Sequence, residues 1–270
     1  MISPGRPGKR RQAADFREAY ALNFSSSDPS LTTLRKCWVN GETDDVEVLY
    51  RDKIPMSRLA GVREHRLVTD ARAFASDTPA DSWAGIGNLV YLTNARLIPL
   101  GETRMHSHRD IDVITVMVQG RIRHAGTLGD GEVLTADEVL VQRAGSEGFS
   151  HNETNPDDSE NRLIQIWVLP EGESEAAGYR HYRLPGGRLT RVYGGEANQD
   201  KTFPAKTVID VACLRGGQSM DVDVPFLAYL ARGRGFANED TISAGTLLRG
   251  DQLTFDCAED ALLILAHLKD

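Results

Sequence analysis

The residues with the clearest chemical potential are histidines that alternate with other residues in two short segments. His106 and His108 are separated by one residue, and so are His151 and Glu153. Because residues i and i+2 of a β-strand point to the same face, each pair is expected to aim into one cavity. Three imidazoles and one carboxylate suit a divalent transition metal and leave room for water or a substrate. The sequence therefore predicts a metal site inside a small β-barrel.

The segments that must position these residues are short, β-rich and separated by turns. From residue 62 onward, Gly, Asp and Asn recur between short apolar runs, a pattern typical of an all-β sandwich or barrel. In the first half we expect strands at 87–99, 103–108, 112–119, 121–125, 138–143 and 163–169, and a connector at 175–184.

The second half repeats this pattern. Strands are expected there at 206–215, 219–224, 226–231, 252–257 and 261–268. Internal self-similarity of this kind favours two duplicated β-units joined by a linker. The second unit has no histidines where the first has its cluster, so a metal is expected only in the first. Asp221 and Asp223 stand at the corresponding place and are expected to be exposed carboxylates.

Composition narrows the class of protein. A net charge of −8 argues against general affinity for nucleic acid, and no apolar run approaches the ~20 residues that span a bilayer. Three cysteines without metal or redox spacing suggest a reducing compartment. We therefore expect a cytoplasmic protein that binds neither membrane nor nucleic acid.

Residues 1–61 differ in amino-acid pattern from the rest of the chain and are expected to form a partly mobile N-terminal extension. The basic, Gly- and Pro-containing start lacks the apolar segment of a secretory signal, and a solvated tail is favoured over a nucleic-acid-binding arm. Residues 12–22 could form one short helix.

Several ordered motifs resemble those of the pirin-like bicupin family. They are a His-x-His-Arg segment at 106–109, an Ala-Gly…His-x-Glu segment at 144–153, and the sequence Gln-Ile-Trp-Val-Leu-Pro at 165–170. The resemblance covers roughly residues 62–270. It implies two cupin barrels in tandem, an N-terminal barrel at 62–184 with the metal site and a C-terminal barrel at 185–270 without metal ligands.

The resemblance also implies a ligand set and an ion. The family's metal ligands carry over onto His106, His108, His151 and Glu153. The expected cofactor is one divalent transition metal, Fe(II) first, with Ni, Mn, Cu, Co and Zn as alternatives.

The activity implied by the resemblance is that of a quercetin 2,3-dioxygenase, an oxidoreductase that opens a flavonol or catechol-type ring. Its substrates would be a small aromatic molecule and O2. Glu153 is then both a ligand and the candidate base that takes the proton of a substrate hydroxyl, with Asp112 as a competitor for either role.

Two other functions are open alternatives. The chain could be a non-catalytic redox sensor whose metal changes charge between Fe(II) and Fe(III) and so regulates the binding of a partner protein. It could also be a cupin with another activity, such as an isomerase, because function lies in the site rather than in the fold.

The remaining histidines are expected to be structural. His124 is expected to face solvent or the barrel rim, and His65, His181 and His267 lack partners in the sequence. Met117 and Phe149 could line an apolar pocket or pack in the barrel core.

Overall fold

The fold of the chain is almost entirely β. A computed structural model describes residues 46–74, 79–172 and 176–269. Within these ranges the helices are the single turn η1 (Arg51–Lys53) and the short α1 (Ala71–Phe74). No helix among the described residues is both long enough and apolar enough to cross a bilayer.

The N-terminal half forms a barrel from two sheets whose strands all pair antiparallel. The larger sheet has the order β12-β9-β6-β11-β4-β3-β2 and the smaller one the order β5-β10-β7-β8. The larger sheet contains β2 (Ser57–Leu59), β3 (Val62–Thr69), β4 (Leu89–Leu97), β6 (Asp112–Gln119), β9 (Glu138–Arg143), β11 (Arg162–Val168) and β12 (Gly178–Arg183). The smaller sheet contains β5 (His106–His108), β7 (Arg121–Gly126), β8 (Val133–Thr135) and β10 (Phe149–Thr154).

The C-terminal half repeats this architecture. Its larger sheet has the order β1-β19-β16-β21-β14-β13 and its smaller sheet the order β15-β20-β17-β18. The larger sheet contains β1 (Glu47–Tyr50), β13 (Arg188–Gly195), β14 (Ala205–Leu214), β16 (Phe226–Arg232), β19 (Thr246–Gly250) and β21 (Ala261–Leu268). The smaller sheet contains β15 (Ser219–Val222), β17 (Arg234–Ala237), β18 (Asp240–Ser243) and β20 (Leu253–Cys257).

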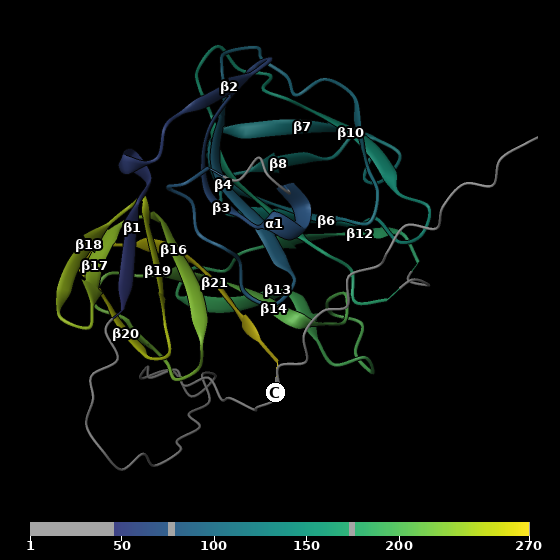
Figure 1. Cartoon of the computed structure of the whole chain (residues 1–270). Helices are drawn as coiled ribbons and strands as arrows, with labels where there is room; N and C mark the ends of the chain where they lie inside the picture. Colours follow the sequence, from purple (N-terminus) through teal and green to yellow (C-terminus); the bar gives the residue numbers. More distant parts are fainter. Residues whose placement is uncertain (1–45, 75–78, 173–175, 270) are drawn as a thin grey trace, which may run out of the picture.

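The strand orders of the two halves correspond element by element. The run β9-β6-β11-β4 matches β19-β16-β21-β14, and β5-β10-β7-β8 matches β15-β20-β17-β18. Figure 1 shows the resulting barrels side by side. The predicted all-β fold with two duplicated barrels is confirmed.

The main hydrophobic core lies between the two larger sheets. Alternate residues of β11 face opposite sides of the larger sheet. Ile164 and Ile166 are fully buried in this core, whereas Gln165 lines a cavity inside the N-terminal barrel. From the C-terminal half, Tyr193 and Ile209 pack in the same core. Each fully buried aliphatic side chain stabilises the fold by about 1.5–3 kcal/mol, so the core between the two larger sheets holds the barrels together.

The interior of the C-terminal barrel is filled by apolar side chains. Met220 and Val222 of β15 are buried in this cluster together with Phe255. The alternate residues Asp221 and Asp223 are only partly buried, and their carboxylates accept hydrogen bonds from Thr254 and Gln252 at 2.9 Å each.

Two segments that the sequence predicts as a connector and as an N-terminal extension contain strands in the structure. Residues 178–183, predicted as part of a connector, instead form β12, which pairs with β9. β1, within the predicted extension, pairs with β19. The predicted helix at 12–22 and the basic start lie outside the described residues. The domain boundaries at 61/62 and 184/185 stay a prediction.

Candidate metal centre

The strand β5 carries two of the predicted ligands and is fixed at both ends by unusual backbone. Arg104 and Asp110 adopt positive φ angles of 67° and 58°, which turn the chain sharply before and after the three-residue strand. Such conformations cost a non-glycine residue about 1 kcal/mol or more each, so the surrounding fold must hold them. The Arg104 carbonyl in turn accepts a hydrogen bond from Nδ1 of His106 at 2.8 Å.

Pairing between β5 and β10 brings the third histidine to the other two. The antiparallel register sets His106 opposite His151, and Phe149 opposite His108. Gly148, just before β10, has a φ of +74°, and a Cβ atom there would lie 2.7 Å from the His108 carbonyl oxygen. A glycine is therefore needed for the two strands to approach each other.

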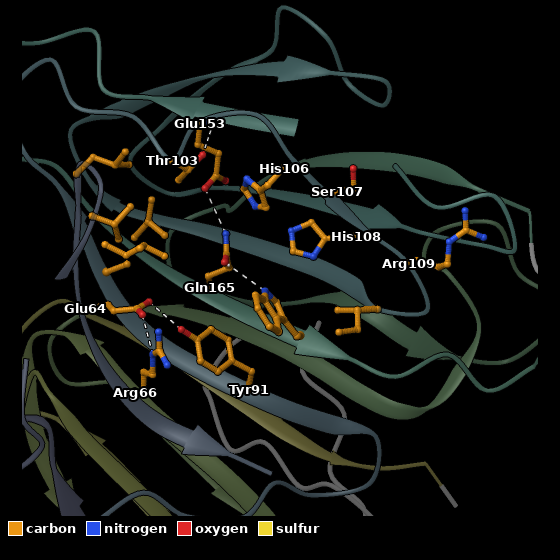
Figure 2. Close-up of a pocket in the computed structure, with 17 residues that line it drawn as sticks. Glu64, Arg66, Tyr91, Thr103, His106, Ser107, His108, Arg109, Glu153 and Gln165 are labelled. Carbon is orange, nitrogen blue, oxygen red and sulfur yellow. Dashed lines mark hydrogen bonds and ion pairs between the residues drawn. The ribbon is translucent and has the colours of Figure 1, made fainter. Parts of the chain in front are cut away.

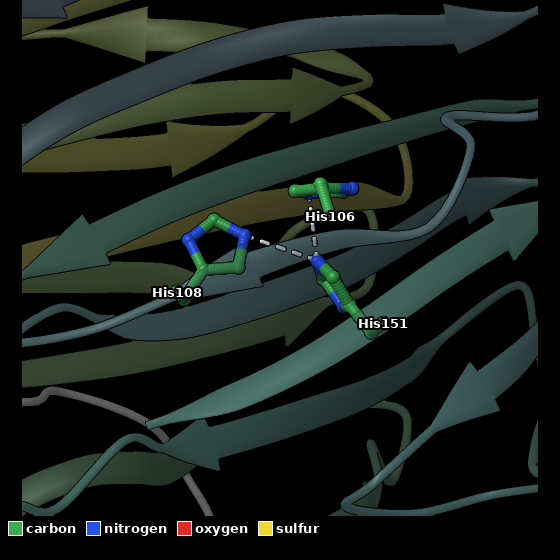
Figure 3. A group of neighbouring side chains, drawn as sticks. All are labelled: His106, His108 and His151. Atoms are coloured by element: carbon green, nitrogen blue, oxygen red, sulfur yellow. Dashed lines mark hydrogen bonds between the residues drawn. The ribbon is translucent and has the colours of Figure 1, made fainter. Parts of the chain in front are cut away.

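The three imidazoles converge through their Nε2 atoms, as Figure 3 shows. Nε2 of His151 lies 3.1 Å from Nε2 of His106 and 3.1 Å from Nε2 of His108. Two nitrogens that bind one ion at about 2.0–2.1 Å lie roughly 3.0–3.4 Å apart for bond angles of about 95–110°. The observed spacing therefore suits a single transition-metal ion.

Two neighbours fix which nitrogen of His151 carries the proton. The Gln142 amide donates from Nε2 to the Leu128 carbonyl at 3.0 Å, which turns its Oε1 toward Nδ1 of His151 at 3.0 Å. His124 donates from Nδ1 to the Gly129 carbonyl at 2.9 Å, so its Nε2, 3.2 Å from the same Nδ1, is also an acceptor. His151 must therefore be protonated on Nδ1, which leaves the Nε2 lone pair free for a metal.

Burial keeps the inner histidines in the neutral form that binds metals. Burial, reinforced by the neighbouring histidines, lowers the pKa of His151 to about 2. Burial and the proximity of His106 lower the pKa of His108 to about 4. Since only the neutral ring has a free lone pair at Nε2, both side chains are ready to bind a cation at neutral pH.

Glu153 lies beside the three histidines but is held differently. Its carboxylate is 1% exposed and accepts hydrogen bonds from Thr115 Oγ1 at 3.0 Å and Gln165 Nε2 at 3.2 Å. Burial raises the pKa of Glu153 to about 7, although these two hydrogen bonds act to lower it. Among the described residues, the ligand atoms that gather within 4.8 Å of one another are those of the histidines alone. The ligand role of Glu153 stays a prediction.

Two other sequence expectations about nearby residues are wrong. His124 does not face solvent: it is 0% exposed, lies opposite Glu153 on the neighbouring strand, and contacts His151 from behind. The alternation on β7, where Ile122 is also fully buried, is the signal that could have placed it inside.

Asp112, the predicted competitor of Glu153, points away from the site. Its carboxylate accepts hydrogen bonds from Tyr193 Oη at 2.7 Å, the Ala144 backbone N–H at 2.9 Å and Arg143 Nε at 3.2 Å. If β5 continued past His108, its alternation would place Asp112 on the face of His106 and His108, but the turn at Asp110 places Asp112 in the other sheet.

His106 and His108 line a cavity of about 480 Å³ inside the N-terminal barrel. Trp167 forms part of its wall, with its ring centroid 5.4 Å from that of His108 and 4.5 Å from that of Tyr91. Figure 2 shows Gln165 between Glu153 on one side and Tyr91 on the other. Met117 and Phe149 pack in the barrel's apolar clusters rather than line this cavity.

Comparison with known proteins agrees with these features. The sequence model of the Pirin family matches residues 88–168. A quercetin 2,3-dioxygenase of Escherichia coli is 33% identical over 80 residues, which are 29% of this chain and 34% of that protein. A pirin-like protein of Caulobacter vibrioides is 29% identical over 120 residues, 42% of this chain and 51% of its own length. The chain thus spans about half or less of the length of these two curated relatives.

The structural similarity extends over both barrels. The nickel(II) complex of a bacterial pirin from Escherichia coli superposes with a TM-score of 0.71 and 17% identity, covering 83% of this chain and 99% of that one. At this identity the likeness concerns the fold. The predicted resemblance to the pirin-like bicupins is thus confirmed by a Pirin family match at residues 88–168 and by a two-barrel fold similar to that of a bacterial pirin.

Proposed function

We propose that this protein is a metal-dependent dioxygenase that opens the ring of a flavonol or catechol-type aromatic, as a quercetin 2,3-dioxygenase does. The observation that carries the proposal is the convergence of three imidazoles on one point beside a cavity that His106 and His108 line. The similarity to the quercetin 2,3-dioxygenase of Escherichia coli supports it.

In this proposal His106, His108 and His151 hold the ion, with Glu153 as a fourth ligand. Fe(II) is the expected ion, with Ni, Mn, Cu, Co or Zn as alternatives. A divalent transition metal supplies Lewis acidity toward a substrate oxygen and, in the case of iron, redox chemistry toward O2.

Glu153 serves as the base of the reaction. Its carboxylate lines the cavity beside the histidines, and Thr115 and Gln165 hold it in place. A carboxyl group whose pKa lies near neutrality can both accept and return a proton. Glu153 therefore takes the hydroxyl proton of the bound substrate and holds it beside the histidines.

The cavity wall binds the aromatic rings and keeps water away. Trp167 offers a flat face next to His108, and its indole N–H donates to Gln165 Oε1 at 3.2 Å, which fixes the ring. Ile111 and Leu163 add apolar surface. A planar substrate can stack on this wall with one hydroxyl directed toward the histidines.

The test is oxygen uptake with quercetin by protein loaded anaerobically with Fe(II). Wild type is expected to consume O2, and His108→Ala is expected to lose the activity together with the metal. His181→Ala, which removes a histidine of β12 outside the cavity, is the matched control and should behave like wild type. Protein that contains iron but consumes no O2 with quercetin would refute the proposal.

A further inference from the structure

The end of the cavity remote from the histidines carries a second group of polar residues. Glu64 and Arg66 of β3 and Tyr91 of β4 line the cavity there. Figure 2 shows these three side chains together at one side, with His106 and His108 at the other and Gln165 between them. The cavity therefore has two chemically distinct ends.

The separation of these ends follows from the sheet register. Arg66 lies opposite Thr93, Thr93 opposite Gln165, and Gln165 opposite Thr115. Neighbouring strands are about 4.8 Å apart, so this row extends roughly 14 Å from Arg66 to Thr115, which holds the carboxylate of Glu153. A ligand that reaches both ends must be elongated.

Both carboxylate oxygens of Glu64 accept hydrogen bonds from neighbouring side chains, and one of these bonds holds Arg66 in place. Its Oε1 accepts hydrogen bonds from Arg66 Nε at 2.7 Å and Ser57 Oγ at 3.2 Å, and its Oε2 accepts from Tyr91 Oη at 2.7 Å and Thr93 Oγ1 at 3.4 Å. Because both oxygens already accept hydrogen bonds, Glu64 has little capacity left to accept hydrogen bonds from a ligand.

Arg66, in contrast, keeps donors free. Its hydrogen bond to Glu64 uses Nε, and its guanidinium also interacts with Tyr91; within the described part of the chain no further protein acceptor engages its terminal N–H groups, so part of their donor capacity is left for a ligand. The side chain is one-third exposed and lines the cavity. A guanidinium fixed through Nε presents these amino groups in one plane, a geometry that suits two adjacent oxygen atoms.

We infer that Arg66, held by Glu64, determines specificity by binding a pair of neighbouring oxygens at the end of the ligand remote from the histidines. A carboxylate or two vicinal hydroxyls on a terminal ring supply such a pair. The inference rests on the proposed function, because it assumes that the other end of the same aromatic ligand binds at the metal centre. It narrows the substrate class to elongated aromatics with paired oxygens on the far ring.

The experiment measures the binding of three flavonols to the full chain loaded with Zn(II), under anaerobic conditions that prevent turnover. Quercetin, kaempferol and galangin share the hydroxyl-ketone end but carry two, one and no hydroxyls on the far ring. A flavonol with a far-ring carboxylate forms a fourth arm, and whether it or quercetin binds more tightly identifies the preferred oxygen pair.

Wild type is expected to bind quercetin or the carboxylate about ten- to a hundredfold more tightly than galangin, because hydrogen bonds to a charged group are worth roughly 1.5–3 kcal/mol. Arg66→Met keeps the apolar stem and should abolish this preference while leaving galangin binding unchanged. Arg66→Lys should restore only part of it. Arg63→Met is the matched control, since Arg63 lies on the same strand but pairs with Glu160 outside the cavity.

Equal affinities of wild type for all four compounds would overturn the inference, and this result does not depend on any variant. An equal loss for galangin and quercetin in Arg66→Met would overturn it as well. If galangin still bound in a zinc-dependent manner, the proposed function would survive either result. Failure of every flavonol to bind zinc-loaded protein would refute both.

Discussion

The hydrogen bonds behind His151 make a sharp prediction about metal affinity. Gln142 and His124 both accept from its Nδ1, and both are locked as acceptors by their own contacts to backbone carbonyls. Replacing Gln142 by Leu removes one acceptor, and replacing His124 by Leu removes the other. Without either, His151 can place its proton on Nε2 and so block the lone pair that faces the metal.

The expected magnitude follows from the redundancy of these contacts. Loss of an orienting partner of a metal-binding histidine typically weakens affinity 10- to 100-fold. Because each single variant leaves one acceptor in place, at 3.0 or 3.2 Å, each should lose about tenfold. The double variant should lose about a hundredfold or more, which corresponds to roughly 2.7 kcal/mol.

The assay is competition for Ni(II) between the protein and a calibrated chelator, with thermal unfolding of the metal-free variants as a check on folding. Gln199→Leu, which removes a glutamine remote from the cavity, is the matched control. If the folded double variant bound nickel within twofold of wild type, the role assigned to these hydrogen bonds would be wrong.

Three further predictions concern the base, acid stability and the metal. Glu153→Gln should retain metal on the histidines yet slow oxygen uptake about 10²-fold or more, and unchanged uptake would exclude it as the base. Burial raises the pKa of Asp210, but hydrogen bonds from His267 and Arg191 outweigh this and lower it below the usual value. The charge of Asp210 therefore stabilises the fold above about pH 4 and ceases to do so as the pH falls through its folded-state pKa. Asp210→Asn should cost about 3 kcal/mol in urea unfolding at pH 7, with the gap to wild type narrowing as the pH falls below about 4; a constant gap would contradict this. Finally, Ni(II) at 100 times its Kd should raise the unfolding free energy by about 2.7 kcal/mol, and no shift in Tm would argue against binding to the folded protein.

The sequence predicted the parts of the site that depend on local spacing. His106 and His108 share one face because β5 is a strand, and the second alternating pair at 151 and 153 lies on β10. Duplication of the barrel was also visible, since both halves repeat their turns and apolar runs.

The errors arose where three-dimensional context overrides local pattern. His124 is a lone histidine among charged residues of β7, and only the pairing with β10 shows that it lies behind His151. The face of Asp112 could not be read from the alternation of β5, because the left-handed residue Asp110 breaks the strand between them. β12 escaped prediction because it is polar and partly exposed, and its partner β9 lies far away in sequence.

The Arg66 site illustrates a different limit of sequence reasoning. Nothing in the local sequence relates β3 to the histidines, and the connection appears only in the register across β3, β4, β11 and β6. Residues that line one cavity can thus come from separate strands with no shared motif.

The most direct test of the central claim is the position of a bound metal in crystals of the protein grown with Ni(II), located by anomalous scattering at the nickel edge. The account predicts one strong peak per chain, about 2.1 Å from the Nε2 atoms of His106, His108 and His151. A peak elsewhere, or no peak in the N-terminal barrel while the histidines keep their arrangement, would contradict it.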